Sequence, residues 1–445
     1  ANGGLETKPG SIYANLGLKL KLVNGDDPVG QVRNYLEGKS PYLRMTSRMA
    51  GLPAELLNKD ARTKPVMFLQ LTWSAGDHIV YQEPRANLDI NGLTVTVKSK
   101  TALGGLKGKR IAIQKGGPHL DLLDDSLRAA GLKWSDVTLV WCKDLTASAD
   151  SPAEVLRAGK ADAACVITPD MIGLTSGMKN VGNGTESTVV GARVINSTAV
   201  MSKSIADVYL VRSDYFKSNR KEVEAFAVGY LKGTEELIKL RDQYNNGAGQ
   251  SPEYLKVLKM GQQIFGEAVL PTIEEDAHGL LCDATFVRIP GNESFFNDPN
   301  NLVGFSVKQK AAVDLAIALG YSTSRAGFEK AEWDYKDISN KVGVKYVPPV
   351  YKEDRIKAEA IDFEKIGDDA ILRFEVKFGA SQTEFDSDTY GAEFQRIAEN
   401  AHLFGNAAIM IKGHSDNYLV LKQFFQAAQS KGLLVRDNAT APWKY

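Results

Sequence analysis

Three short polar segments follow predicted strands, and their residue types suit the binding of a small polar molecule. The segment KGGPHL follows the β-branched run RIAIQ and supplies Lys115, Gly116, Gly117 and His119. Glycines let the backbone approach a ligand closely, and the free N–H groups at the start of a helix favour an anionic group. The plain alternative is a strand-to-helix turn that carries an exposed histidine.

The segments WSAGD and TPD occupy matching places after two other predicted strands. Trp73 offers an apolar face, Ser74 lies in the turn, Asp77 offers a charge, and Asp170 would face the same crevice. Ligands bind at the carboxyl ends of strands in open parallel sheets, so these segments together predict a small-molecule cleft. The alternative for both aspartates is that each caps a helix.

The sequence gives little indication of catalysis. It contains no GxSxG, HExxH, Walker or GxGxxG motif, so a hydrolase, a zincin or a nucleotide-binding protein is not predicted. The five histidines lie far apart without metal-ligand spacing, and the three cysteines form no CxxC pair. We therefore expect no cofactor, no metal and no enzymatic activity.

Composition and charge narrow the classes of partner. Lys+Arg and Asp+Glu are both 54, so the chain has no global attraction to nucleic acid or to anionic membranes. The 445 residues, 43% of them hydrophobic, predict two or three compact units. No apolar run reaches about 18 residues, so no transmembrane segment is expected.

Strands and helices alternate most clearly between residues 106 and 175. Strands are predicted at 110–114, 137–142 and 161–167, with helices between them. This alternation is typical of an α/β fold, in which helices cover both faces of a parallel sheet.

The flanking regions have a similar organisation as far as about residue 330, and a polar segment at 331–368 is predicted to be a linker. A small α/β unit is expected at 369–445. Further strands are predicted at 17–24, 65–73, 207–212, 371–378 and 407–413, and further helices at 222–240, 251–266, 271–281, 307–320, 393–405 and 419–432.

Several segments resemble the solute-binding proteins of ABC importers, nearest to the nitrate, sulfonate and taurine type. The resemblance rests on LKGKRIAIQKGGPHLDLLDDSLRAAGLKWSDVTLVWC and SPAEVLRAGKADAACVITPD, with LTWSAGDHIV in the expected order. It implies the two-lobed periplasmic-binding-protein fold of type II, which closes around a ligand. Lobe I would combine residues 1–105 and 206–330, and lobe II would be 106–205.

The resemblance also implies a ligand site at the start of the chain. In the family pattern the first strand would precede residue 1, so Asn2, Gly3 and Gly4 would form a ligand-facing turn. A small polar or anionic ligand, a periplasmic or cell-envelope location and an ABC importer as partner are further implications. Thiamine-pyrimidine synthase relatives share the fold but carry a cysteine-rich motif that this sequence lacks.

The tail resembles the OmpA-like domain that binds peptidoglycan. The segments ILRFEVKFGASQTEFDS and IMIKGHSDN carry this resemblance, which implies that Asp416, with His414 beside it, binds the wall peptide. The helix LKQFFQAAQSKG lacks the arginine that the family places there, and Arg436 lies outside the motif. A purely structural copy of the domain is the alternative.

Two hypotheses of different class follow. In the first, the chain captures a small solute between two lobes, and the tail holds it near peptidoglycan. In the second, the chain is a structural or docking component of an envelope assembly that reuses the same fold without transport. An enzyme of this fold is the least favoured, because no nucleophile or base pair is identifiable in the sequence.

Overall fold

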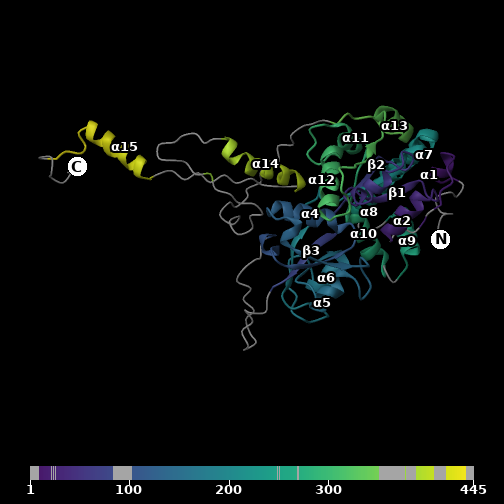
Figure 1. Ribbon diagram of the computed structural model, residues 1–445, viewed down its shortest axis with the longest axis horizontal. Helices are drawn as coiled ribbons and strands as arrows, with labels where there is room; N and C mark the ends of the chain where they lie inside the picture. Colours follow the sequence, from purple (N-terminus) through teal and green to yellow (C-terminus); the bar gives the residue numbers. More distant parts are fainter. Residues whose placement is uncertain are drawn as a thin grey trace. The chain divides into compact units, whose positions relative to one another are not determined.

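The computed structural model contains two compact units, Ala1–Ala407 and Ala408–Tyr445. The first unit is a mixed α/β structure with two five-stranded sheets, here called sheet A and sheet B (Figure 1). The α/β class predicted from the sequence is thereby confirmed. The residues that the structure describes are 10–21, 23, 25, 27–83, 103–247, 249, 251–267, 270–349, 376, 387–404 and 417–436.

Sheet A is built around two long neighbouring strands, β8 (Ala206–Arg212) and β2 (Pro65–Ser74). The strand order is β1 (Tyr42–Thr46), β8, β2 and β10 (Glu329–Lys330), and β9 (Ala284–Phe286) also pairs with β2. β8 runs antiparallel to both of its neighbours, whereas β10 is parallel to β2. Nine of the ten residues of β2 are buried, because other elements cover both faces of the sheet.

Sheet B has the order β5 (Thr138–Cys142), β4 (Arg110–Gln114), β6 (Ala163–Ile167), β3 (Asp77–Gln82) and β7 (Ala192–Ser197). The strands β5, β4 and β6 are parallel, as the alternation of strands and helices predicts. β3 is antiparallel to both β6 and β7. The first residue of β3, Asp77, pairs with the last residue of β6, Ile167. The chain enters sheet B from sheet A at this end of the two strands.

The helices follow sequence signals in several places, for example a proline in the first turn of α2, α5 and α9. The helices are α1 (Ile12–Asn15), α2 (Pro28–Leu36), η1 (Met49–Gly51), α3 (Ala54–Leu57), η3 (Leu103–Leu106), α4 (His119–Ala129), η4 (Trp134–Asp136), α5 (Pro152–Arg157), α6 (Thr168–Thr175), α7 (Ser213–Ser218), α8 (Arg220–Asn246), α9 (Pro252–Phe265), η5 (Ile273–Ala277), α10 (His278–Cys282), α11 (Ile289–Asn297), α12 (Phe305–Ala318), α13 (Tyr335–Val342), α14 (Ser387–Leu403) and α15 (Asn417–Ser430).

The strand expected at 17–24 is wrong for its described residues. Residues 17–21 form no strand, although Leu18 and Leu20 both reach the apolar core of sheet A. Alternating lysine and leucine predicts a half-buried strand, but here the leucines pack against the core of sheet A as irregular chain. β1 lies further along the chain instead.

Part of the segment predicted as a linker is packed on sheet A. Tyr335 and Ile338 of α13 are buried in the sheet A core, and the indole N–H of Trp333 donates to the carbonyl oxygen of Phe68 at 2.8 Å. The domain boundaries as a whole stay predictions. In the tail, α14 and α15 overlap the predicted helices, whereas the predicted strand 407–413 and all but one residue of 371–378 lie outside the described residues.

The turn after β1 packs closely against α12. A Cβ added to Gly51 would lie 2.6 Å from the carbonyl carbon of Ala312 and 2.8 Å from its Cβ. Only a residue without a side chain permits this approach. The contact fixes η1 against α12 and so sets the spacing between residues at the ends of both elements.

We predict that Gly51→Ala destabilises the fold, because the added methyl group overlaps the backbone of α12. Overpacking of this kind costs about 1–3 kcal/mol in free energy of unfolding, measured by urea denaturation. Gly261→Ala in α9 is the matched control, since nothing lies within 4 Å of its Cβ position. That control should be neutral or stabilising by up to about 1 kcal/mol. Equal stability of the two variants would contradict the assigned contact.

Candidate functional site

Two short crossings join the sheets and position the candidate residues. One crossing links Ser74, at the end of β2, to Asp77, at the start of β3; the other runs from β7 to β8. The N–H of Ser74 donates to the carbonyl oxygen of Ile205 at 3.1 Å, so the crossings lie side by side. The backbone N–H of Asp77 donates to Thr198 Oγ1, and its carbonyl oxygen accepts from the N–H of Thr198, both at 2.9 Å.

Asp77 is a buried carboxylate with two polar side-chain contacts. It is 5% exposed, its Oδ2 accepts a hydrogen bond from Ser74 Oγ, and His119 Nε2 lies 3.0 Å from its Oδ1. Burial alone would raise the pKa of Asp77, but the contacts with His119 and Ser74 outweigh burial and lower it. Asp77 opens a strand, so the alternative that it caps a helix is wrong.

Two buried histidines near Asp77 have ring nitrogens without a hydrogen-bond partner in the described part of the chain. His119 is fully buried and its Nδ1 has no partner. His78 Nε2 lies 3.1 Å from Thr168 Oγ1, while its Nδ1 also has none. Burial lowers the pKa of His78 to about 4, so this ring is neutral at physiological pH.

Asp170 lies in the first turn of α6 and does not cap that helix, whose N-cap is Ile167. Its Oδ1 accepts from Thr146 Oγ1 at 3.1 Å, and its Oδ2 has no partner among the described residues. Burial raises the pKa of Asp170, and the nearby His119 partly offsets this. Asp170 and His119 are therefore close enough to interact electrostatically.

The glycine turn before α4 is packed rather than open. Gly116 has φ +68°, a conformation that glycine adopts without strain, and its Cβ position lies 4.0 Å from Leu52 Cδ1. A side chain at Gly117 would overlap the side chain of Gln114. The side chain of Lys115 is exposed. Leu52 follows η1 on the sheet A side, so the two sides touch at this turn.

Trp73 lies apart from the Asp77 group. It is 7% exposed, packs edge-on against Phe295 at 6.2 Å, and belongs to the core of sheet A. The Nζ atoms of Lys203 and Lys308 lie 5.1 Å and 5.4 Å from its ring centre. The predicted site residues are thus divided between two neighbouring polar groups. Asn2, Gly3, Gly4, His414 and Asp416 lie outside the described residues.

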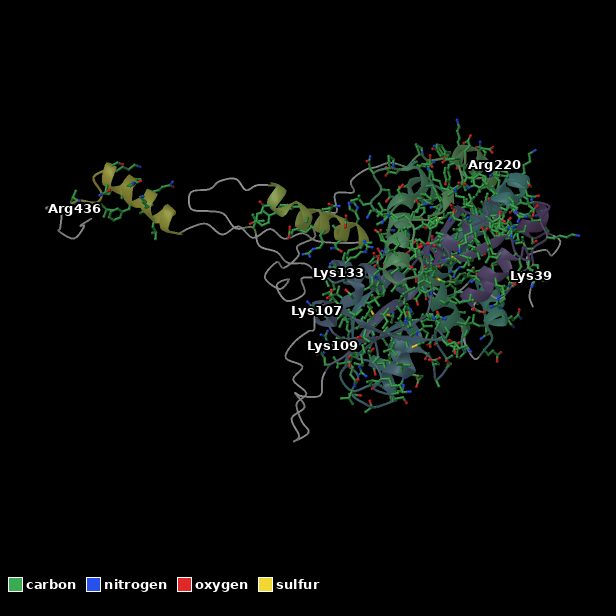
Figure 2. All side chains as sticks on the ribbon, in the orientation of Figure 1. Lys39, Lys107, Lys109, Lys133, Arg220 and Arg436 are labelled. Atoms are coloured by element: carbon green, nitrogen blue, oxygen red, sulfur yellow. The ribbon has the colours of Figure 1, made fainter. Side chains whose placement is uncertain are left out.

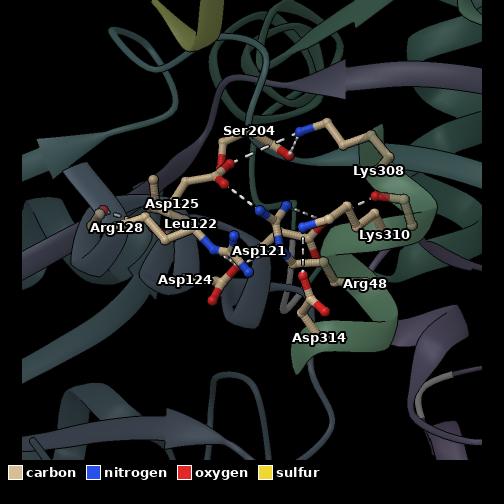
Figure 3. A network of polar contacts seen from close by, with 12 residues as sticks. Arg48, Asp121, Leu122, Asp124, Asp125, Arg128, Ser204, Lys308, Lys310 and Asp314 are labelled. Carbon is tan, nitrogen blue, oxygen red and sulfur yellow. Dashed lines mark hydrogen bonds and ion pairs between the residues drawn. The ribbon is translucent and has the colours of Figure 1, made fainter. Parts of the chain in front are cut away.

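A buried charge network was missed by sequence reasoning (Figure 3). Arg48, between β1 and η1, is 2% exposed and meets three aspartates of α4. Its Nε lies 3.0 Å from Asp124 Oδ2, it pairs with Asp125, and its Nη1 lies 3.8 Å from Asp121 Oδ1. The segment LDLLDDSL places these acids at i, i+3 and i+4 on one helix face. That pattern among leucines is a readable signal of a buried acidic face.

Lys308 of α12 joins the same network from the sheet A side. Its Nζ donates to the carbonyl oxygens of Lys203 at 2.6 Å and Ser204 at 2.8 Å, and lies 3.9 Å from Asp125 Oδ2. Ser204 Oγ donates to the same carboxylate oxygen at 2.7 Å. The network therefore connects α12, the second crossing and α4.

Two surface cavities lie away from these groups. One of about 630 Å³ is lined by α8 residues and Arg288, and one of about 790 Å³ by residues that include Tyr81 and Arg157. Among the labelled cations of the first unit, Lys107, Lys109 and Lys133 lie on one side of the view, and Lys39 and Arg220 lie on the other (Figure 2). Within the described ranges, no three His, Cys, Asp or Glu side chains are arranged to hold a metal ion. No helix in those ranges has the length and apolarity needed to cross a membrane.

Comparison with known proteins gives one family match over part of the chain. Residues 91–243, less than half of the chain, match the family model described as NMT1/THI5 like. That match covers α4 and most of sheet B, including the turn with Gly116 and Gly117. Comparison with curated proteins gives no match.

Several solved structures are similar at low identity. The periplasmic aliphatic sulphonate binding protein SsuA from Escherichia coli is 16% identical, with a TM-score of 0.45, over 72% of this chain and 87% of that chain. The periplasmic sulfonate-binding protein SsuA from Methylobacillus flagellatus KT is 17% identical, with a TM-score of 0.43, over 76% and 85%. The periplasmic nitrate-binding protein NrtA from Synechocystis PCC 6803 is 15% identical, with a TM-score of 0.38, over 57% and 62%. None of these likenesses fixes a ligand for this chain.

We predict that Asp77→Asn lowers the free energy of unfolding by about 1.5–3 kcal/mol at neutral pH, because contacts to a charged group are lost. The folded pKa of Asp77 lies below 3.8, so its contribution is present above that pH and is lost as the pH falls further. The gap between wild type and variant should therefore narrow in acid, as measured by urea denaturation.

Asp170→Asn is the control for this measurement. Asparagine can still accept the single hydrogen bond from Thr146, so the expected change is below about 1 kcal/mol. Equal losses in the two variants would show that Asp77 makes no special contribution.

Proposed function

We propose that this chain is a cell-envelope solute-binding protein that captures a small polar or anionic ligand between the parts built on sheets A and B. The observation that carries the proposal is a set of buried polar atoms with no hydrogen-bond partner among the described residues, His119 Nδ1, His78 Nδ1 and Asp170 Oδ2. An unpaired buried polar group costs about 1–3 kcal/mol, so a ligand that supplies the missing partners gains that energy on binding. The NMT1/THI5-like match over 91–243 supports the same assignment.

The charges around this group suggest how a ligand would be oriented. Asp77 and Asp170 would accept hydrogen bonds from ligand donors, and the two imidazoles would serve as donors or acceptors. An anionic group would instead meet Lys203, which lies on the same crossing as Thr198. The Nζ of Lys203 lies over Trp73 and makes no hydrogen bond in the described part of the chain. Burial lowers the pKa of Lys203, so an anion would also stabilise its charged form.

The setting of this function follows from the same family likeness. A periplasmic location and an ABC importer as partner are proposed here, as is the division into two lobes at about residues 105 and 206. The tail is proposed to hold the protein near peptidoglycan through Asp416. The described end of α14 belongs to the first compact unit, where Leu403 accepts a hydrogen bond from the N–H of Lys203 at 3.0 Å.

A structural or docking role is the second candidate, and one observation favours it. The apolar cluster of sheet B includes Leu52 and Leu315 from elements on the sheet A side. Opening the crevice would expose both leucines to water, and the burial of each contributes about 1.5–3 kcal/mol to the stability of the closed form. Permanent closure would suit a scaffold better than a transport protein.

We predict a thermal shift when the ligand class is present. The panel consists of alkanesulfonates, nitrate, amino acids and pyrimidines. A ligand at a hundredfold excess over its dissociation constant adds about 2.7 kcal/mol to the free energy of unfolding. Lys203→Gln should abolish the shift with an anionic ligand, because it removes the available cation. Lys107→Gln, on the surface, is the matched control and should keep the full shift.

Native mass spectrometry of the purified full chain separates the two candidates. A bound small molecule supports solute capture. Stable protein partners with no small molecule, together with no shift from any panel member, favour the structural role instead.

A pulldown with purified peptidoglycan tests the tail. Asp416→Ala should reduce binding of the full chain, because the variant removes the carboxylate that would accept hydrogen bonds from the wall peptide. Glu399→Ala, an exposed carboxylate on α14, is the control and should bind like wild type. If Asp416→Ala binds as well as its parent, the role assigned to that residue is wrong.

A further inference from the structure

Helix α4 carries three buried aspartates, Asp121, Asp124 and Asp125. It packs on sheet B, and residues of α12 belong to the same apolar cluster. Asp121, Asp124 and Asp125 are each at most 3% exposed, and they meet Arg48 and Lys308 from the sheet A side (Figure 3). The ionic contacts of Arg48 and Lys308 with these aspartates therefore all join the sheet A side to α4.

The charges of this dry contact do not balance. The three carboxylates meet two fully buried cations, Arg48 and Lys308. Arg128 adds one contact, 2.9 Å to Asp124, but its side chain is 46% exposed and lies on α4 itself. A surplus negative charge away from water is costly, because desolvation is not repaid by a paired cation. The contact therefore favours one additional proton.

Asp124 and Asp125 are well compensated as anions. Asp124 accepts from Arg48 Nε at 3.0 Å and from Trp134 Nε1 at 2.8 Å, besides its contact with Arg128. Asp125 pairs with Arg48 and accepts from Ser204 Oγ at 2.7 Å. Each of these carboxylates therefore contacts the Arg48 guanidinium and a neutral donor group.

Asp121 is the weakly compensated member. Its hydrogen-bond partners are neutral hydroxyls, Thr46 Oγ1 at 2.5 Å and Ser47 Oγ at 3.3 Å. The guanidinium of Arg48 is more distant, with Nη1 at 3.8 Å, and this nitrogen has no hydrogen-bond partner within the described ranges. A protonated Asp121 could donate to Thr46 in the same geometry, since a hydroxyl oxygen also accepts.

We propose that Arg48, Lys308 and the three aspartates of α4 form a latch that holds the two sides together without a ligand, and that closing the latch takes up a proton at Asp121. The proposal does not require that the chain bind any solute. In the open form water would solvate all five groups, so the cost of the surplus charge exists only when the latch is closed.

The electrostatics of Asp121 support this assignment. Burial raises the pKa of Asp121 to about 7, against the opposing effects of Arg48, Thr46 and Lys308, while Asp125 raises it further. Burial also lowers the pKa of Lys308 to about 8. The other charged groups beside the latch, Lys310 and Asp314 of α12, pair with each other at 3.1 Å.

The direction of the pH dependence follows from linkage. In water an aspartate has a pKa of about 3.9, so between about pH 4 and pH 7 the closed form binds more protons than the open form. Closing is therefore favoured by acid, by up to about tenfold in the equilibrium constant per pH unit. Above that range Asp121 is ionised in both forms and its effect no longer changes with pH.

Hydrogen exchange of the α4 backbone amides, corrected for the intrinsic pH effect, tests the latch in the full chain without ligand. Opening should become more frequent from mildly acidic to neutral pH in the wild type. Asp121→Asn keeps the shape of a protonated aspartate, so its opening should be independent of pH over this range and as rare at neutral pH as that of acidified wild type. Asp150→Asn, an exposed residue, should keep the wild-type dependence.

A second variant guards against failure to fold. Arg48→Lys keeps the charge but loses the planar fork that meets two carboxylates, so opening should increase at least about tenfold while the circular dichroism spectrum is retained. A wild type whose opening does not vary with pH would overturn the proton uptake, as would Asp121→Asn with the wild-type slope. Small-angle scattering that shows separated halves in the unliganded wild type would overturn the latch itself. These outcomes involve no solute, so they are distinct from failure of the proposed function.

Discussion

A guanidinium group removed from water must find negative charge, and this single constraint organises the centre of the molecule. Arg48 is almost fully buried, and its ionic partners all lie on α4. Removing Arg48 would leave buried carboxylates without their cation, which costs far more than a surface ion pair contributes. The positions of β1, η1 and α4 are therefore interdependent, because each brings a charge that the others must neutralise. Apolar packing of Leu52 and Leu315 beside the same helix reinforces the arrangement without specifying it.

The two polar groups at the junction of the sheets are connected through one segment of chain. The crossing from β7 to β8 holds Asp77 through Thr198 at one end and Asp125 through Ser204 at the other. Lys203 lies between them, over Trp73. A displacement of this crossing would alter both groups together, because its hydrogen bonds reach the start of β3 and the middle of α4. Capture of a ligand and contact between the sheets would therefore be coupled through this segment.

Local patterns predicted much of the fold, whereas long-range electrostatics could not be read from them. The run RIAIQ is β4 to the residue, and the parallel order of β5, β4 and β6 follows from the alternation of strands and helices. WSAGD was correctly placed at a strand end, but its turn residues suit a following helix and a following strand equally, so β3 was missed. The ion pair of Arg48 with Asp124 joins residues that are 76 positions apart, and no sequence periodicity links residues so far apart. Only the acids within LDLLDDSL gave a local sign of it.

The crossing from β2 to β3 consists of Ala75 and Gly76 alone, and its shortness has a consequence for how this protein can vary. A Cβ at Gly76 would meet the carboxyl carbon of Asp283 at 2.8 Å, and its carbonyl oxygen accepts from the N–H of Thr168 at 2.9 Å. Adding one residue here would displace β3 by one position, and every side chain of that strand would turn to the opposite face. An added residue is therefore expected to be costly at this point, whereas surface loops generally tolerate insertions better.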